Sequence, residues 1–317
     1  MPELPEVEIT CRGLLPLVSA SVANVVIRNA SMRWPIPAHL PETLSNQTLI
    51  SLKRRAKYIL AEFSDQNNDP MKGQLASSLA AHSLGPKPVD KFSDLNQIID
   101  NNNISGTLLL HLGMSGRISL LDRHYPPEKH DHFDILFNNG RVLRLRDPRR
   151  FGAVLWAGAE PHNHALLQPL GPEPLDADFN AAYLFNALIR RNTAIKISIM
   201  DSHLVVGVGN IYASESLFRA RIHPETPAKL VTLGQCEQLI FHIKTTLNDA
   251  LNAGGSSLRD FFGVDGNIGY FQQEYFVYGR TSKPCKVCSQ AIQCIRLGQR
   301  STFYCASCQV LNTIENR

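Results

Sequence analysis

Four of the seven cysteines follow the spacing C-x2-C-x16-C-x2-C, and this pattern constrains the fold more than any other feature of the chain. Each C-x2-C pair places two thiolates on one knuckle, and two knuckles complete a closed tetrahedral site of the structural zinc type. The pattern predicts one structural Zn2+ ion in a zinc-ribbon β-hairpin, with the ligands Cys285, Cys288, Cys305 and Cys308. The other three cysteines, Cys11, Cys236 and Cys294, are interpreted as ordinary packing residues.

Length and composition bound the class of protein. The 317 residues suggest about two domains, and 44% of them are hydrophobic, an ordinary share for a globular protein. No apolar run approaches the roughly 18 residues of a membrane span, and the chain starts with acidic residues, unlike a signal peptide. We therefore expect a cytoplasmic protein without membrane contact.

The first half of the chain carries short apolar runs separated by turn residues. Many short strands with such punctuation favour an antiparallel sandwich or barrel, and Asn138-Asn139-Gly140 is a hairpin signal between two of them. Apolar residues at helical spacing predict a helix at 5–18, ahead of the strands. The strands are expected at 22–27, 49–52, 58–63, 107–112, 118–121, 133–137, 141–146 and 153–156.

Residues 64–106 break this rhythm, because they are polar and rich in Asn, Asp, Ser, Gly and Pro. Loops of more than about 15 residues are usually functional or disordered. We interpret the segment as a mobile surface insertion between two paired strands, in which residues 75–84 could form a short helix.

Residues 171–177 include the sequence Gly-Pro-Glu-Pro-Leu and are interpreted as a hinge. Beyond them the periodicity becomes helical, with helices expected at 179–190, 193–200, 211–220 and 233–251. The predicted fold is α+β: an N-terminal antiparallel β-sandwich with flanking helices, a helical domain and the C-terminal zinc-ribbon β-hairpin. The domain boundaries are expected at 1–170, 178–274 and 275–310.

The distribution of charge is more informative than the net charge of +4. Five arginines fall between Arg141 and Arg150, with one acid among them, and residues 275–314 contain basic residues but no Asp or Glu. Such one-sign patches suit a polyanionic partner. The alternative is that each patch is a solvated strand face.

The N-terminus carries a chemically useful group if Met1 is removed. Pro2 would then present a free secondary amine, and an α-amino group has a pKa near 7.7–8.0, well below that of lysine. Such an amine can add to an aldehyde-level carbon and give a cationic iminium, which is an electron sink. Glu3 and Glu6 are candidate acids and bases beside it. The alternative is a frayed, solvated terminus.

The sequence Val-Gly-Val-Gly-Asn at 206–210 places two glycines before a predicted helix, with Asn210 as its N-cap candidate. Exposed N–H groups at a helix N-terminus bind phosphate. A plain connection between two helices is the alternative.

The chain as a whole resembles the bacterial formamidopyrimidine-DNA glycosylases (Fpg type). The matching motifs run in order from residue 2 to 308: Pro-Glu-Leu-Pro-Glu at 2–6, Arg-Arg-Ala-Lys-Tyr at 54–58, His-Leu-Gly-Met-Ser-Gly at 111–116, Glu-Lys-His-Asp-His at 128–132, Asp-Pro-Arg-Arg-Phe-Gly at 147–152, residues 201–216, and the cysteine ribbon with Gln-Arg-Ser-Thr-Phe-Tyr at 299–304. Only residues 64–106 have no counterpart in the family pattern.

The resemblance implies catalytic roles by position. Pro2 would attack the sugar C1′, Glu3 would assist ring opening and proton transfer, Lys57 would take part in β-elimination, and Arg300 would take part in δ-elimination and hold a phosphate next to the lesion. Zinc would then be structural, because the strand is cut without metal-bound water.

The resemblance also implies the DNA contacts. A base must leave the duplex before its C1′ can be attacked, and Met114, Arg149 and Phe151 would fill the gap, with Arg149 facing the orphaned partner. Without the resemblance, Met114 and Phe151 would be interpreted as core residues. A helix–two-turn–helix is expected at about 193–220 and a glycine-rich lid over the damaged base at 254–269. The remaining DNA-contacting positions are His130, Arg191, Lys196 and Asn210.

The predicted function is that of a bifunctional DNA glycosylase and AP lyase in base excision repair. It would act as a monomer on damaged double-stranded DNA, remove 8-oxoguanine and formamidopyrimidines through a Schiff base at Pro2, and cleave the strand by β,δ-elimination. One alternative is the endonuclease VIII branch, which prefers oxidised pyrimidines and has glycine where this chain has Leu4. Another is a zinc protein that binds lesions without catalysis, against which Pro2, Glu3 and Lys57 argue.

Overall fold

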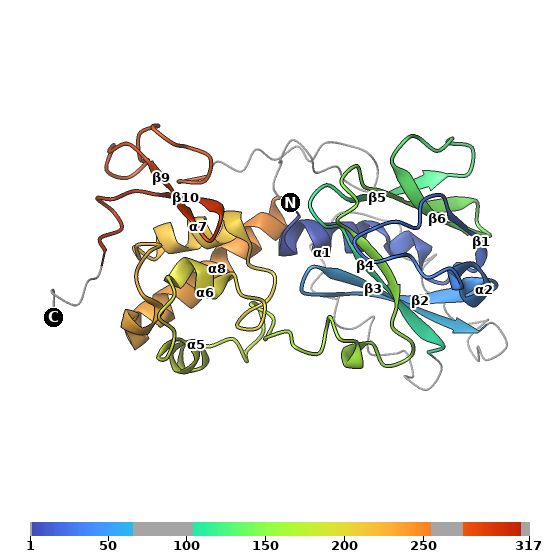
Figure 1. The fold of residues 1–317 in the computed structure, drawn as a ribbon, viewed down its shortest axis with the longest axis horizontal. Helices are drawn as coiled ribbons and strands as arrows, with labels where there is room; N and C mark the ends of the chain where they lie inside the picture. The colour runs from blue at the N-terminus through green and yellow to red at the C-terminus, as the bar shows by residue number, and fades with distance from the viewer. Residues whose placement is uncertain (1, 66–103, 255–274, 312–317) are drawn as a thin grey trace, which may run out of the picture.

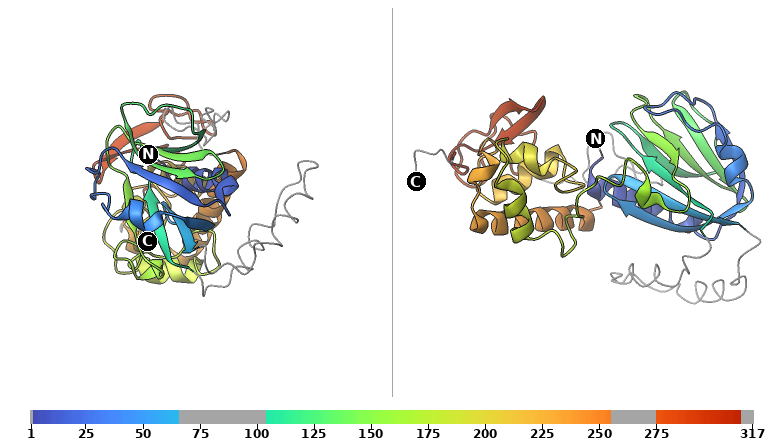
Figure 2. Two further views of the ribbon diagram at one scale, coloured as in Figure 1. Left: turned by 90° about the vertical axis from the view of Figure 1, so that its right-hand side faces the viewer. Right: turned by 60° about the horizontal axis from the view of Figure 1, so that its bottom comes forward.

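The computed structural model describes residues 2–65, 104–254 and 275–311. Two sheets lie at one end of the long axis, and the helices α5–α8 with a small hairpin lie at the other (Figure 1). The right-hand view of Figure 2 shows the same division, with the C-terminal hairpin on the helical end. The predicted α+β class is confirmed, as is the order of sandwich, helices and hairpin.

Eight antiparallel strands form the sandwich. One sheet has the order β1-β6-β7-β5 and the other the order β2-β3-β4-β8. All eight predicted strands are present. Three have the predicted bounds, β4 is shifted by one residue, and the other four extend beyond the apolar run because polar residues continue the pairing at their ends. Their bounds are β1 Val22–Ile27, β2 Gln47–Arg55, β3 Tyr58–Asp65, β4 Gly106–His111, β5 Arg117–Asp122, β6 Asp131–Phe137, β7 Arg141–Arg146 and β8 Ala153–Trp156.

Two connections between strands of the sandwich can be compared with the predictions from the sequence. The predicted Asn138-Asn139-Gly140 turn joins β6 to β7, and Gly140 has the positive φ of 81° that such turns require. The insertion lies between two paired strands as expected, because Phe63 of β3 is paired with Gly106 of β4. The strand β3 continues to Asp65, while the helix considered at 75–84 lies outside the described residues. The short helix α2 (Leu40–Leu44) was not predicted.

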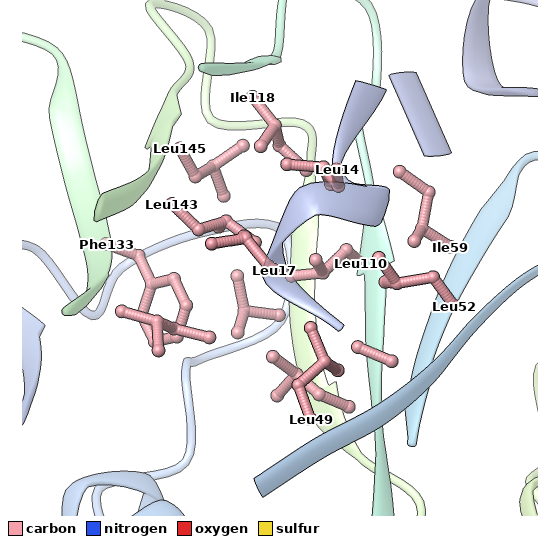
Figure 3. Packing of buried hydrophobic residues seen from close by; sticks show 14 of the residues in the cluster. Leu14, Leu17, Leu49, Leu52, Ile59, Leu110, Ile118, Phe133, Leu143 and Leu145 are labelled. Carbon is pink, nitrogen blue, oxygen red and sulfur yellow. The ribbon is translucent and has the colours of Figure 1, made fainter. Parts of the chain in front are cut away.

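The core of the sandwich lies between the sheets and beneath the N-terminal helix. Leu14 and Leu17 project from the start of the chain onto Leu52 and Leu110 of one sheet and Leu143 of the other (Figure 3). Cys11 belongs to the same buried cluster, which confirms its packing role, and burial raises the pKa of its thiol to about 12.

The N-terminal helix α1 (Leu4–Gly13) links the two halves of the molecule. It ends earlier than the predicted residue 18 and continues as the 3-10 turn η1 (Leu15–Leu17), because Pro16 has no N–H for the next helical hydrogen bond. The helix contacts β2 and β3 on one side and α8 on the other. Leu4 is fully buried in the core of the helical half, so the first residues of the chain are held by both halves.

The helical half comprises α5 (Ala181–Leu188), α6 (Ile195–Ile199), α7 (Asn210–Arg219) and α8 (Leu233–Asn252). The long helix α8 starts with a capping box between Thr232 and Gln235 and packs against α5 and α7. Cys236 is fully buried in this core, as predicted. Among the described residues, the helices are all too short or too polar to cross a membrane.

The hairpin of β9 (Gln293–Leu297) and β10 (Arg300–Tyr304) lies over α7, as Figure 1 shows. Its turn, Gly298-Gln299, has positive φ at both residues, 52° and 61°. A Cβ at Gly298 would lie 2.6 Å from the side chain of Ile197 in α6, so glycine lets the turn approach that helix. Cys294 lies exposed on β9, so its prediction as a packing residue was wrong.

Candidate active site

The carboxylate of Glu3 is buried at the N-terminus of α7. Its Oε2 accepts the N–H of Gly209 at 2.9 Å, and its Oε1 accepts the N–H of Ile211 at 3.0 Å. These contacts correct two expectations. The N-cap position of α7 is Gly209 and not Asn210, and the N–H groups that were expected to bind phosphate are taken by a carboxylate of the chain itself.

The two glycines of this turn are required by close approach. Gly207 has a φ of 78° and its carbonyl accepts the N–H of Leu4 at 3.2 Å. A Cβ at Gly209 would lie 2.1 Å from the Cδ of Glu3. The turn therefore packs directly against the first residues of the chain. Residues 3 and 209, far apart in the sequence, are in contact for this reason.

Glu6 fixes Glu3 from the other side. Its Oε2 accepts the backbone N–H of Glu3 at 2.8 Å, and its Oε1 accepts the hydroxyl of Tyr212 at 2.8 Å. Both glutamates are buried, at 1% and 0% exposure. Pro2, which precedes them, is partly exposed. The frayed-terminus alternative is therefore wrong for residues 3–6, since this segment is anchored to the start of α7.

Lys57 lies in the two-residue turn between β2 and β3, and not within a strand. Burial and the charge of Arg300 lower its pKa, and Glu3 opposes that shift. Burial in turn raises the pKa of Glu3, against the effect of Lys57. A raised carboxyl pKa and a lowered ammonium pKa bring the proton affinities of the two groups closer together, which is an arrangement suited to proton transfer.

A cavity of about 320 Å³ lies between the two halves and the hairpin. The predicted residues Glu3, Met114, Asn210 and Arg300 all reach it, and Arg300 is exposed at the start of β10. Four further residues line it that the sequence analysis did not identify: Ile211, Tyr278, Ser301 and Phe303. Phe303 lies within a motif that we did recognise, whereas nothing in the pattern around Tyr278 indicates a site.

Lys196 and Asn210 join the helices to the hairpin. The Lys196 ammonium, which is fully buried, donates to the Asn210 Oδ1 at 2.6 Å and the Thr302 hydroxyl at 2.6 Å. The Asn210 amide donates to the Ser301 carbonyl at 3.0 Å. Both residues were predicted as DNA contacts, and here their polar atoms bind protein beside Arg300. Direct contact of Lys196 with DNA stays a prediction.

Three predicted gap-filling residues lie exposed on two neighbouring loops. Met114 is 39% and Phe151 is 41% exposed, so the alternative that they are core residues is wrong. The guanidinium of Arg149 lies over the Phe151 ring, 4.7 Å from its centroid. The buried Asp147 shapes the second loop by accepting the N–H groups of Arg149 and Gly152 at 3.2 and 2.8 Å.

His111 shapes the loop of Met114. Burial, with the charge of Lys57, lowers the pKa of His111 to about 4, so its ring is neutral. Its Nδ1 accepts the N–H of Gly113 at 3.1 Å, and Gly113 has a φ of 62°. The motif at 111–116 is therefore a turn that presents an exposed methionine.

The arginine-rich segment 141–150 differs from the expected polyanion-binding patch. Arg141, Arg144 and Arg146 form ion pairs with Asp122, Asp134 and Asp131 at 2.6–3.2 Å, so acids from other strands neutralise them. Arg149 and Arg150 are exposed. The basic stretch after residue 275 does present an exposed set, consisting of Lys283, Lys286, Arg296 and Arg300.

The last two predicted DNA contacts lie apart from the cavity. His130 is partly exposed and directly precedes β6, with its ring 6.4 Å from that of His132. Arg191 is paired with Asp201 at 2.7 Å. The lid expected at 254–269 lies outside the described residues, apart from Gly254.

The four ribbon cysteines come together as predicted. The sulfur atoms of Cys285, Cys288, Cys305 and Cys308 all lie within 4.8 Å of one another. Four thiolates from two knuckles fit one tetrahedral zinc ion with no open position, which makes the site structural. The site lies at the base of the hairpin, with Phe218 of α7 in the same buried cluster.

These features define a two-part protein in which Glu3, the start of α7 and the zinc hairpin meet at one cavity. Family models match this arrangement in three parts: the formamidopyrimidine-DNA glycosylase N-terminal domain at residues 1–154, the formamidopyrimidine-DNA glycosylase H2TH domain at 170–262, and the zinc finger found in FPG and IleRS at 282–310. The chain belongs to the formamidopyrimidine-DNA glycosylase family.

Individual relatives cover almost the whole chain. A protein of Methylobacillus flagellatus named formamidopyrimidine-DNA glycosylase is 57% identical over 309 residues, which is 98% of this chain and 96% of the relative. The crystal structure of the MutM (Fpg) protein of Thermus thermophilus is 30% identical, with a TM-score of 0.76, and covers 98% of this chain and 100% of its own. The Lactococcus lactis Fpg in complex with DNA containing N7-benzyl-Fapy-dG is 28% identical, with a TM-score of 0.79 and the same two coverages.

Proposed function

We propose that the protein is a bifunctional DNA glycosylase and AP lyase that removes oxidised purines, 8-oxoguanine and formamidopyrimidines, from duplex DNA in base excision repair. The observation that carries this proposal is the buried Glu3 carboxyl, held beside the N-terminal proline and within electrostatic reach of Lys57. Family membership and the solved relative with lesion-containing DNA support it.

The first step uses the amine of Pro2 after removal of Met1. Its nitrogen forms a bond to the sugar C1′ as the bond from C1′ to the base breaks, and the base leaves with the proton that the nitrogen gives up. Glu3 donates a proton to the ring oxygen as the C1′–O4′ bond opens, and the nitrogen lone pair then completes the iminium. The raised pKa of Glu3 favours the protonated form that this transfer needs.

The second step cuts the strand. The iminium acidifies the C2′ proton, and its removal by a base gives an enamine. The nitrogen then returns its electron pair, a C2′–C3′ double bond forms, the C3′–O bond breaks and phosphate leaves, so that a conjugated iminium remains. We assign Lys57 to this β-elimination, because burial lowers the pKa of its ammonium and so favours the neutral amine that can act as a base. Arg300, exposed at the cavity, would hold a neighbouring phosphate and assist the δ-elimination.

DNA recognition is proposed to use both halves of the molecule. Met114, Arg149 and Phe151 would enter the duplex in place of the flipped nucleotide, and an exposed apolar pair is suited to that insertion. His130, Arg191, Lys196 and Asn210 would contact DNA around it. Cys285, Cys288, Cys305 and Cys308 would hold the zinc ion that stabilises the hairpin.

The proposal also covers the domain organisation, oligomeric state and location of the protein. We propose a monomeric, cytoplasmic enzyme with units at 1–170, 178–274 and 275–310 joined by a hinge at 171–177. Among the described residues, separate hydrophobic clusters in the sandwich, among the helices and at the cysteines support this division.

Borohydride trapping is the decisive experiment. Reduction of the iminium should link the Met1-processed protein covalently to DNA carrying 8-oxoguanine opposite cytosine. Protein that retains Met1 should give no adduct, because its amine lies one residue away. Glu3→Gln should lose base removal, while Pro2→Gly keeps an amine and should alter the balance of the two steps. Absence of an adduct with fully processed protein would refute the proposal.

Lesion preference distinguishes this proposal from the endonuclease VIII alternative. Excision of 8-oxoguanine and of thymine glycol should be compared in otherwise identical duplexes. The protein should excise 8-oxoguanine in preference to thymine glycol. A strong preference for thymine glycol would instead support the endonuclease VIII alternative.

A further inference from the structure

The turn that carries Lys57 is held by the segment linking the two halves of the molecule. This turn consists of Ala56 and Lys57, flanked by the paired residues Arg55 and Tyr58. Ala56 is buried and has a φ of 55°, a conformation that alanine adopts only when surrounding contacts impose it. The position of the Lys57 side chain therefore depends on what holds Ala56.

Glu173 supplies those contacts. Its Oε1 accepts the Ala56 N–H at 2.7 Å, and its carboxylate also pairs with Arg54 at 2.6 Å and Arg55 at 2.9 Å. The Glu173 side chain is 14% exposed, so these charge-assisted bonds are screened little by water. One carboxylate thus binds three consecutive residues, the last two of β2 and the first of the turn.

The two arginines extend the network in different directions. Arg54 also pairs with Glu8 of α1 at 2.9 Å. Arg55 donates to the carbonyls of Leu170 and Gly171 at 3.0 and 2.6 Å. The turn is consequently tied both to the helix that follows Glu3 and to the start of the linker.

The same linker is attached to the loop that ends at the Glu3 site. The Gly171 N–H donates to the Ser202 carbonyl at 2.8 Å, and the Val206 N–H donates to the Pro172 carbonyl at 3.2 Å. Val206 directly precedes the Gly207–Gly209 turn that holds the Glu3 carboxylate. The linker therefore lies between the two elements that carry Lys57 and bind Glu3.

We propose that Glu173 is a positioning residue that sets the Lys57 ammonium relative to Glu3 and Pro2, so that strand cleavage depends on the linker. This inference rests on the proposed function. A change in the relative position of the two halves would reach Lys57 through this carboxylate. No role in binding DNA is required of Glu173 itself.

Glu173→Gln tests the proposal with a duplex that contains a preformed abasic site. The variant keeps the size of the side chain but removes the charge facing two guanidinium groups. Displacement of a catalytic group by 1 Å can cost about 100-fold, so the ratio of strand cleavage to borohydride-trapped adduct should fall roughly 10-fold or more at saturating enzyme. Arg55→Gln loosens the same turn from its other partner and should act in the same direction.

The Lys57→Met background separates positioning from general stability. If Glu173 acts through Lys57, Glu173→Gln should slow cleavage much less in this background than in the native chain. Glu62→Gln is the matched control, because Glu62 is a buried glutamate on β3 that pairs with Lys53 at 2.9 Å, away from the turn. It should leave the cleavage ratio unchanged.

Three outcomes decide the matter. Equal losses in the native and Lys57→Met backgrounds, or an unchanged ratio in Glu173→Gln, would overturn the positioning role. Absence of any trapped adduct in the native protein would instead refute the proposed function. If Glu173→Gln does not fold, Arg55→Gln in both backgrounds gives the same comparison.

Discussion

Substitution of Gly209 by alanine tests whether the Glu3 carboxyl works from the position in which the fold holds it. The backbone of Gly209 has a φ of −112°, which alanine adopts without strain. The added Cβ, however, would lie 2.1 Å from Cδ and 2.4 and 2.5 Å from the two carboxylate oxygens of Glu3. The three nearest atoms that the added Cβ would meet all belong to the Glu3 side chain, so the substitution acts on that carboxyl.

The size of the effect follows from this geometry. An ordinary contact begins at 3.4 Å, so the carboxyl has to move by about 1.3 Å, which breaks its bonds to the N–H groups of Gly209 and Ile211. A displacement of about 1 Å costs roughly 100-fold in rate, equivalent to about 2.7 kcal/mol of transition-state stabilisation. Base excision should fall at least that far. Overpacking of this buried site should also lower the free energy of unfolding, by about 1–3 kcal/mol.

The assay is single-turnover excision of 8-oxoguanine with enzyme in excess, together with thermal unfolding. Gly234→Ala is the matched control, because it lies in α8 and its added Cβ would have no atom within 4 Å. The control should keep its activity and gain about 0.5–1 kcal/mol in stability. If Gly209→Ala excises the base within about twofold of the native rate, the reasoning from Glu3 geometry is refuted.

Three further predictions address zinc, the exposed loops and acid stability. Chelation should release one zinc ion per chain and abolish DNA binding, because the ion stabilises the hairpin that bears Arg300; binding that survives chelation would contradict this. Met114→Ala and Phe151→Ala should change the free energy of unfolding by less than about 0.5 kcal/mol yet impair excision. Leu110→Ala in the core should instead lower the free energy of unfolding by about 2–5 kcal/mol. Calorimetry measures the stability of each variant, and excision assays measure its activity. Burial alone would raise the pKa of Asp201, but hydrogen bonds from Arg191 and His203 lower it from 3.8 to about 2. The Asp201 side chain is 31% exposed, so solvent screening reduces its contribution to stability to roughly 1 kcal/mol or less. That contribution is present above about pH 4 and is lost as the pH falls towards 2, so Asp201→Asn should make the free energy of unfolding depend less on pH in this range.

The predictable part of the site consists of residues whose chemistry depends on local spacing. The cysteine pattern identified four ligands because two C-x2-C knuckles form without reference to the rest of the chain. The resemblance located Glu3, Met114, Asn210 and Arg300, and these side chains reach one cavity. The sequence did not indicate which acidic side chains pair with which basic side chains.

The arginine-rich segment illustrates that limit. Five arginines in ten residues look like a phosphate-binding patch, but three of them pair with acids of other strands. Alternation along β7 gives the charges, while the neighbours that neutralise them come from β5 and β6. No pattern within residues 141–150 contains that information.

The sequence by itself determined the α+β architecture, the strands, the hairpin turn at Gly140 and the zinc ligands, because each depends on periodicity or spacing within a few tens of residues. Tertiary structure alone decided that the Gly207–Gly209 turn holds a carboxylate and not a phosphate. It likewise decided that Lys196 is buried and that Glu173 binds the turn of Lys57. These contacts join residues more than 100 positions apart, and only the packed fold fixes which of the available charges meet.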